Sequence, residues 1–222
     1  MDLGIAGAAL ATVAGYCVGG VIPLIYFLTG ERSGLRLGKT KLYGRQLLQA
    51  CANGSSELMS NVSSSLVSIL YNFQLLRYYG ENGISAYGVL MYVQFIFIAI
   101  FVGYSIGCAP VVGFHYGAEN HRELKNMLGK GVLLMGIGGI VLTALAQGLA
   151  EPLAHIFVGY DADLYTLTVH AFRLFSFTFL LAGFNIFSAS FFTALNNGGV
   201  SAAISVLRTL VFQCTCVLIL PE

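Results

Sequence analysis

Six polar side chains recur along an otherwise apolar stretch of this chain, at residues 54–76. Wound as a helix at about 100° per residue, all six fall within about 100° of one another, and large apolar side chains fill the opposite side. One carboxylate beside several amides and hydroxyls can exchange a proton, hold a cation or hydrogen-bond a polar solute. We call this set the polar line: Glu57, Asn61, Ser64, Ser65, Ser68 and Asn72.

The polar line has two interpretations. Glu57 lies about one turn into the expected span, so it either favours the positive N-terminus of a helix or acts as a protonatable or cation-binding carboxylate at the cytoplasmic end of a cavity. The amides and hydroxyls either join helices by hydrogen bonds or line a solute path. Because the line is continuous, we expect this part of a cavity wall: Glu57, Asn61, Ser64, Ser68, Asn72 and, on the next span, Gln94.

Two arginines interrupt the last two apolar segments. Arg173 is too deep to reach the membrane surface easily, and we expect it to face the cavity with a partner outside this chain. Arg208 is predicted to be a structural charge that pairs with an acid or with helix carbonyls. By depth, Glu57 and Arg208 are expected in one layer near the cytoplasmic side.

The composition excludes an ordinary soluble domain. Hydrophobic residues make up 57% of the 222 residues and charged residues only 9%, whereas soluble domains carry about 25% charged residues. The fold class is therefore all-α, a polytopic helical membrane protein whose immediate surroundings are the lipid bilayer. The net charge of +1 says nothing about nucleic acid, and no basic tract suggests such a partner.

An enzyme and a metal site are not expected. No span carries a paired nucleophile and base or a cluster of metal ligands. His115, Glu119 and His121 lie in a predicted wet loop without the HExxH arrangement of a catalytic zinc site. We accordingly expect no cofactor.

Charge clusters divide the chain into six predicted transmembrane helices. The segments between them are a basic linker at 31–45 with a short interfacial lead-in at 47–52, a turn at 77–83, a polar loop at 115–130, an acidic loop at 151–163 and a tight turn at 196–199. Gly103, Gly107 and Pro110 predict a kink in the third span. The predicted spans are 3–30, 54–76, 84–112, 131–150, 164–195 and 200–220.

The distribution of Lys and Arg orients these spans. The segments 31–45 and 115–130 hold five and three basic residues, whereas 77–83 and 151–163 together hold one. Basic loops stay in the cytoplasm, so both ends of the chain are expected on the outer side of a plasma membrane. From this outcome and the abrupt last span, we expect the chain to be a fragment of a longer protein.

Three stretches carry a family resemblance: GIAGAALATV, APVVGFHYGAENHRELKNML and GFNIFSASFFTALNNGG. They resemble the MATE (multidrug and toxic compound extrusion) family, within it the prokaryotic drug exporters. The resemblance implies the sixth to eleventh of twelve helices: residues 1–30 as the last helix of the N-terminal lobe, 31–53 as the cytoplasmic inter-lobe linker with its interfacial segment, and 54–222 as an incomplete C-terminal lobe of five helices. The rest of the N-terminal lobe and the twelfth helix would be partners of this chain.

The resemblance also implies an activity. It is the efflux of drugs or other amphipathic organic solutes by ion-coupled alternating access, with H⁺ or Na⁺ as the coupling ion. Similar proteins carry acids on the seventh and tenth helices. Glu57 lies on the matching seventh helix, nearer its start than the family acid, and Asn185 stands where the tenth-helix acid is expected. The alternatives are a lipid-linked saccharide flippase of the same superfamily, which would favour an arginine-rich cavity, and a non-transporting membrane scaffold.

Overall fold

The computed structural model describes residues 4–29, 41 and 43–219, and every regular element among them is a helix. The chain forms two compact units, Met1–Gly44 and Arg45–Glu222, which we describe separately. The first unit holds α1 (Gly4–Thr29), 26 residues with Pro23 inside. At about 1.5 Å per residue this helix can cross a bilayer core of about 30 Å. Most of the predicted linker lies outside the described residues.

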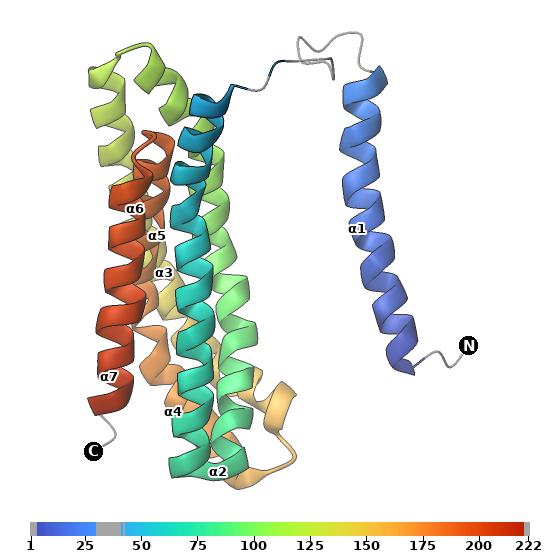
Figure 1. The fold of residues 1–222 in the computed structure, drawn as a ribbon. Helices are drawn as coiled ribbons and strands as arrows, with labels where there is room; N and C mark the ends of the chain where they lie inside the picture. Colours follow the sequence, from blue (N-terminus) through green and yellow to red (C-terminus); the bar gives the residue numbers. More distant parts are fainter. Residues whose placement is uncertain (1–3, 30–40, 42, 220–222) are drawn as a thin grey trace. The chain divides into compact units, whose positions relative to one another are not determined.

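The second unit begins with a helical hairpin, α2 (Gly44–Gly117). Its backbone is helical except at Gly80, where φ is 64° and ψ is −149°, a conformation that a residue with a Cβ rarely adopts. The chain reverses direction there, and α2 returns beside itself (Figure 1). Residues 44–79 are called the first arm and residues 81–117 the second arm. Each arm is long enough to cross the bilayer, as the sequence predicts on either side of the turn at 77–83.

The helices extend well beyond the apolar segments that mark them in the sequence. The predicted lead-in at 47–52 is helical and continuous with the second span, because α2 runs unbroken from Gly44. The predicted loop at 115–130 is also wrong, since α2 ends at Gly117 and α3 (His121–Val158) follows after three residues. Hydropathy marks the part of a helix in hydrocarbon, whereas the backbone hydrogen bonds that form the helix continue into water.

A short turn joins α2 to α3. Glu119 has a φ of 55°, and the Oδ1 of Asn120 accepts a hydrogen bond from the backbone N–H of Glu123 at 3.2 Å, which caps α3. His115 and His121 therefore lie on helices rather than in an open loop. The acidic loop predicted at 151–163 is likewise mostly helical, because α3 continues to Val158 and α4 (Ala162–Ser176) begins after three intervening residues.

The fifth crossing is broken into α4 and α5 (Phe179–Ala194), which meet at an angle of 50°. The break frees backbone carbonyls that a membrane interior would leave without partners. Side chains of α3 bind two of them: Gln147 Nε2 donates to the carbonyl of Arg173 at 2.9 Å, and Thr143 Oγ1 donates to that of Ser176 at 3.3 Å. Specific hydrogen bonds from α3 thus stabilise the break between α4 and α5.

The last crossing is a single column of three helical segments, α6 (Gly198–Val206), the π-helix η1 (Leu207–Gln213) and α7 (Cys214–Ile219). Among the described residues, four helices are long and apolar enough to cross a membrane, and a fifth crossing arises when α4 and α5 count as one. Counting the two arms of α2 separately gives six crossings, which confirms the predicted all-helical membrane fold.

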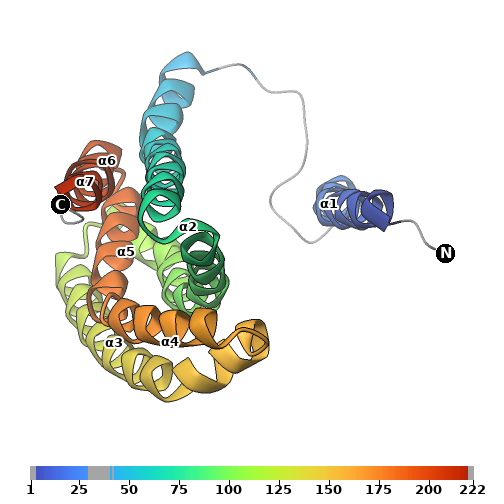
Figure 2. The same ribbon diagram turned by 90° about the horizontal axis from the view of Figure 1, so that it is seen from below.

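The core of the second unit is aromatic. Phe179 at the start of α5 stacks on Phe97 of the second arm, with ring centroids 5.1 Å apart, and meets Phe175 edge-on. Phe101 and Met135 are also fully buried beside them. Seen from below, α5 lies among α2, α3 and α6, so this core is the centre of the bundle (Figure 2).

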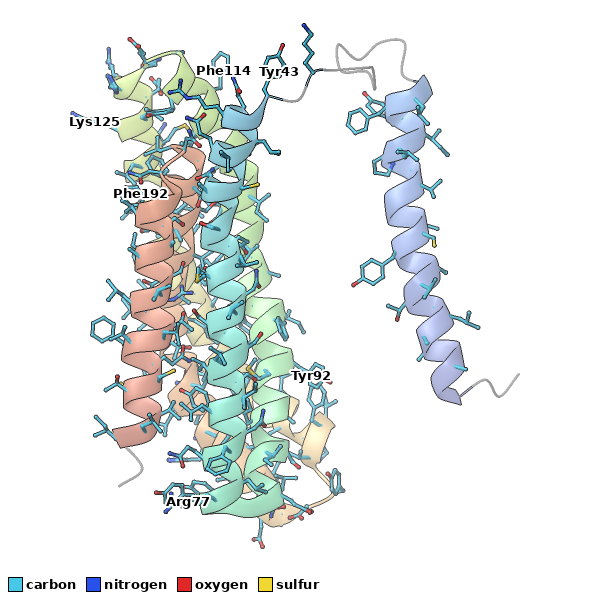
Figure 3. The ribbon with its side chains drawn as sticks, viewed as in Figure 1. Tyr43, Arg77, Tyr92, Phe114, Lys125 and Phe192 are labelled. Atoms are coloured by element: carbon cyan, nitrogen blue, oxygen red, sulfur yellow. The ribbon has the colours of Figure 1, made fainter. Side chains whose placement is uncertain are left out.

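The two ends of the second unit differ in the residues that they carry. Lys125, Phe114 and Phe192 lie at one end, and Arg77 lies at the other (Figure 3). The polar segment around 115–130 and the turn between the arms of α2 are therefore on opposite sides, as the predicted alternation of crossings requires.

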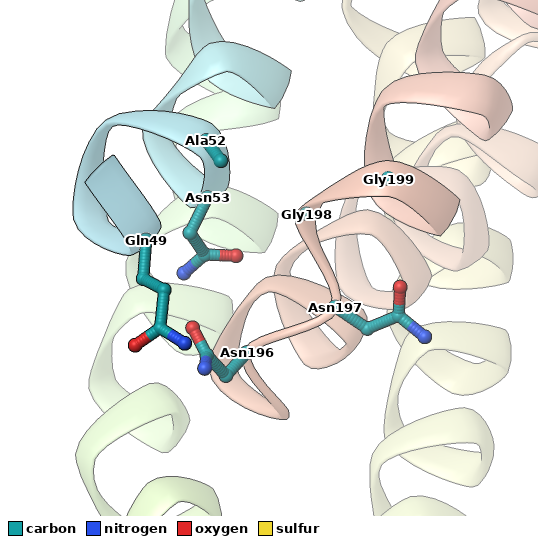
Figure 4. A pocket seen from close by; sticks show the side chains of 7 residues that line it. All are labelled: Gln49, Ala52, Asn53, Asn196, Asn197, Gly198 and Gly199. Atoms are coloured by element: carbon teal, nitrogen blue, oxygen red, sulfur yellow. The ribbon is translucent and has the colours of Figure 1, made fainter. Parts of the chain in front are cut away.

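The turn between α5 and α6 packs closely on the start of α2 (Figure 4). Asn53 Nδ2 donates to the carbonyl of Thr193 at 3.2 Å. A Cβ added at Gly198 would lie 2.6 Å from the Cα of Asn53 and 3.0 Å from the carbonyl oxygen of Ala52, and neither backbone atom can move aside alone. This contact fixes the inner end of the last crossing against α2.

We therefore expect Gly198→Ala to lower the free energy of unfolding by about 1–3 kcal/mol, the usual cost of overpacking. Gly199→Ala is the matched control, since no atom lies within 4 Å of a Cβ there. Thermal unfolding of the purified protein in detergent measures both. Equal midpoints for the two variants would mean that the turn does not pack on α2 in solution.

Candidate functional site

The polar line lies largely open on the first arm of α2. Glu57, Asn61, Ser64 and Ser65 are exposed. Ser68 and Asn72 are half-buried. The described structure therefore leaves the first four members of the line, at residues 57–65, without a covering helix in the second unit.

Hydrogen bonds along the polar line stay mostly within α2. Asn61 Nδ2 donates to the carbonyl of Glu57 at 2.9 Å and lies 3.5 Å from its Oε1. Ser65 Oγ donates to the carbonyl of Asn61 at 2.9 Å, and Asn72 Nδ2 donates to that of Ser68 at 3.0 Å. Such local bonds satisfy polar side chains without a neighbouring helix. They do not join α2 to any other described helix, while Ser68 does reach the hydroxyl of Tyr87 on the second arm.

The face of α2 that contacts the last crossing lies beside the polar line. Asn53 meets Gly198 at one end, and Gln74 Nε2 donates to the carbonyl of Val217 at 3.4 Å toward the other end. These contacts show that the two helices run parallel. A residue of α2 therefore lies at the same depth as the residue of the last crossing whose number is about 144 higher. At about 100° per residue, Ser64 lies only about 20° from the direction of Asn53, so it is the line's closest member to this contact face.

That register corrects two interpretations of Glu57. The α2 helix begins 13 residues before Glu57, so the helix N-terminus is about 20 Å away and its dipole does not explain this carboxylate. Glu57 is level with Ser201, seven residues below Arg208, or about 10 Å along the helices. The expectation that Glu57 and Arg208 share one layer is therefore wrong, and no ion pair joins them in the described structure.

Arg173 has a partner within this chain, so the expected partner elsewhere is wrong. Its Nη2 lies 2.6 Å from Glu151 Oε1, with both side chains at least half exposed. Glu151 belongs to the acidic loop predicted at 151–163. Instead, α3 continues past Glu151 to Val158, and the carboxylate contacts Arg173 of α4 from this helix. The continuation of α3 is what brings the two charges together.

We expect the Arg173–Glu151 pair to contribute about 0.2–1 kcal/mol, as partly exposed ion pairs do. A double-mutant cycle of Arg173→Gln, Glu151→Gln and the double variant isolates this coupling energy from chemical or thermal unfolding in detergent. Strictly additive single effects would show that the two side chains do not interact.

The remaining expected cavity residues are scattered over other helices. Gln94 is half-buried on the second arm. Asn185 is half-buried on α5, where its Nδ2 donates to the carbonyl of Leu181 at 3.2 Å. No hydrogen bond in the described structure links either amide to the polar line, so their part in one cavity stays a prediction.

A second polar line, which sequence reasoning missed, runs along the last crossing. Ser201, Ser205 and Thr209 recur every four residues and are all buried. Ser201 Oγ donates to the carbonyl of Ala189 at 2.9 Å and accepts from Thr193 Oγ1 at 2.9 Å. The spacing of these hydroxyls was readable in the sequence as one helix face, but only the structure shows that Ser201 joins α6 to α5.

Two hollows are open in the second unit, and neither contains a member of the polar line. One has a volume of about 250 Å³ and is lined by amides and glycines where the α5–α6 turn meets α2 (Figure 4). The other, of about 480 Å³, lies toward the outer end between the first arm and α7. It is lined by Tyr71, Gln74, Leu75, Tyr78, Tyr79, Cys216 and Val217.

The chain is similar to known proteins in sequence and in fold. The model of the MatE family matches residues 58–217. A curated relative, the probable multidrug resistance protein YoeA of Bacillus subtilis (strain 168), is 26% identical over 148 residues, which cover 62% of this chain and 32% of that protein.

Solved structures show the same fold. A MATE protein in complex with MaL6 superposes with a TM-score of 0.89 at 19% identity, over 98% of this chain and 50% of that one. An outward-facing multidrug resistance MATE transporter gives 0.87 at 20% identity, over 96% and 48%. A transporter from Pyrococcus furiosus, described as having a binding pocket of reverse polarity, gives 0.86 at 19% identity, over 96% and 48%. The chain thus spans about half the length of these structures.

Proposed function

Because this chain belongs to the MatE family, we propose that it forms part of a secondary transporter that exports drugs or other amphipathic organic solutes. The MatE family consists of transporters rather than enzymes. The chain is a multi-pass membrane protein. The transport cycle would be alternating access, in which two helical lobes rock about a central site and an ion gradient drives outward release.

The open polar line of α2 is the observation that carries the proposal. A carboxylate, amides and hydroxyls lie exposed on a helix that is long and apolar enough to cross a membrane. Hydrocarbon would not solvate them, so in the membrane this surface faces a wet cavity or another part of the protein. A wall of small polar groups beside apolar side chains suits solutes of varied shape.

The parts of the chain would then take distinct roles. Residues 1–30 would be the last helix of one lobe, 31–53 the cytoplasmic linker, and 54–222 five helices of the other lobe. The basic residues near 115–130 support a cytoplasmic position for that end, with the turn at Gly80 outside a plasma membrane. The complementary surface would come from the rest of the transporter.

The coupling ion would be H⁺ or Na⁺, taken up at Glu57. In the described residues Glu57 is the only acid on the polar line, and Asn61 supports its carboxylate from one turn away. Asn185, an amide, stands on α5 where a second acid would serve a two-acid Na⁺ site. This favours a single carboxylate that binds one cation or one proton at a time.

A lipid-linked saccharide flippase is the less favoured activity. Such a cavity would need free arginines facing a pyrophosphate, but Arg173 is occupied by Glu151 at 2.6 Å. Arg208 is then the remaining cationic side chain deep in the described crossings of the second unit.

Efflux from proteoliposomes tests the proposal. The protein expressed from its full open reading frame is reconstituted, and ethidium movement is followed under an imposed pH or Na⁺ gradient. We expect gradient-dependent transport, whereas a scaffold would show none with either gradient. Asn61→Ala should slow transport several-fold, and unchanged transport would remove the polar line from the path.

A further inference from the structure

Arg208 lies at the centre of the last membrane crossing. The column formed by α6, η1 and α7 spans Gly198–Ile219, 22 residues, and Arg208 is 10 residues from its first and 11 from its last. At about 1.5 Å per residue, the backbone of Arg208 lies about 15 Å from the start of the column at Gly198, which is about half of a core of about 30 Å. Arginines reach the surface from near helix ends, so this one must be satisfied at depth.

The described residues supply few hydrogen-bond acceptors for that guanidinium. Arg208 is half-buried, and its Nε donates to Thr209 Oγ1 at 3.4 Å, a long hydrogen bond. A guanidinium has four further N–H donors, and in the described residues they make no hydrogen bond and meet no carboxylate. Glu57 lies about 10 Å away along the helices, and Glu151 is held by Arg173.

The local backbone is also unusual. Arg208 is the second residue of the π-helix η1, inside a column that is otherwise α-helical. Single π-helical turns within α-helices occur frequently at functional sites, because they redirect side chains at a chosen point. By the register set at Asn53 and Gln74, Arg208 is level with Ser64, the member of the polar line closest to the contact between these two helices.

We propose that Arg208 binds the anionic group, a carboxylate or a comparable oxyanion, of an amphipathic solute held near the bilayer midplane. The planar guanidinium presents parallel donors that match such a group, and the polar line, which has Ser64 at the same depth, would supply neutral hydroxyls and amides for the rest of the solute. This assignment rests on the proposed transport function, and it adds anionic solutes to the expected substrates. A phospholipid headgroup is the less suitable occupant, since headgroups lie at the surface, about 15 Å from this depth.

Binding of two dyes of opposite charge tests the assignment. The protein expressed from its full open reading frame, in uncharged detergent, is titrated with carboxyfluorescein and with ethidium, and fluorescence anisotropy gives the affinities. Arg208→Gln should weaken carboxyfluorescein binding by about 10- to 100-fold, as expected for losing a charge-assisted hydrogen-bonded pair. Ethidium affinity should change less than about twofold in the same variant. Arg77→Gln, in the turn between the arms of α2, removes the same charge and should alter neither.

Two further measurements keep the outcome decisive. Arg208→Lys retains the charge but loses the paired donors, so it should fold where glutamine fails and still bind carboxyfluorescein less tightly than the wild type. Unchanged carboxyfluorescein affinity in both variants, or no binding by the wild type, would overturn the proposal. Displacement of the dye by phosphatidylglycerol but not by benzoate would assign the site to a lipid and overturn it as well.

The result is separable from the proposed function. If wild-type vesicles do not move ethidium but anion binding still depends on Arg208, the transport proposal fails and the anion site stands. If ethidium is transported and carboxyfluorescein binding ignores Arg208, the reverse holds.

Discussion

Glu57→Gln should abolish most gradient-driven efflux and leave the protein folded. The substitution keeps the size and hydrogen-bonding shape of the side chain but removes the charge that would take up the coupling ion. Because Glu57 is exposed on α2 and the backbone contacts of Asn61 do not depend on its charge, the fold should tolerate the change. We expect transport against a gradient to fall about tenfold or more, equivalent to at least about 1.4 kcal/mol of lost coupling.

The matched control is Glu81→Gln. Glu81 is also an exposed acid on α2, but it adjoins the Gly80 turn rather than the polar line. Initial efflux rates in proteoliposomes with and without the ion gradient separate coupling from passage: downhill movement of ethidium should survive in Glu57→Gln. If coupled efflux in that variant matches the wild type, the coupling acid lies elsewhere in the protein.

Phe179→Ala should be the most destabilising of the substitutions considered. The side chain is 1% exposed, stacks on Phe97 and meets Phe175 edge-on. Truncation leaves a cavity that the surrounding helices cannot fill, with a typical cost of about 3–5 kcal/mol. The lost free energy comes from van der Waals contacts between packed side chains, so the cost is expected even where lipid rather than water surrounds the helices.

Phe177→Ala provides the comparison within the same helix break. Phe177 is 57% exposed, so its loss should cost well under 1 kcal/mol. Thermal unfolding midpoints in detergent, measured with the Arg173 and Gly198 variants, should place Phe179→Ala far below all of them. Similar midpoints for the two phenylalanine variants would mean that α5 does not pack on the second arm as described.

The class of the fold and the number of crossings follow from the amino-acid sequence alone. Long apolar segments can satisfy their backbone groups in a membrane only as helices, so composition and charge clusters were sufficient. The polar line was also readable, because the period of a helix is fixed and places Glu57, Asn61 and Ser64 on one side whatever surrounds them.

Helix ends and the pairing of charges were beyond that reasoning. Hydropathy gives the apolar part of a helix, and so the loops predicted at 115–130 and 151–163 proved to be mostly helix. The extension of α3 brings Glu151 to Arg173, two residues that are 22 positions apart and whose meeting depends on how α3 and α4 pack.

Which polar groups have hydrogen-bond or ion-pair partners, and how deep they lie in the membrane, depends on how the helices pack against one another. The contacts of Asn53 with Gly198 and of Gln74 with Val217 set the register of two helices that are far apart in the chain. That register separates Glu57 from Arg208 and puts Arg208 level with Ser64. A local period cannot specify such a relation, because sliding one helix along another changes its neighbours without changing its own pattern.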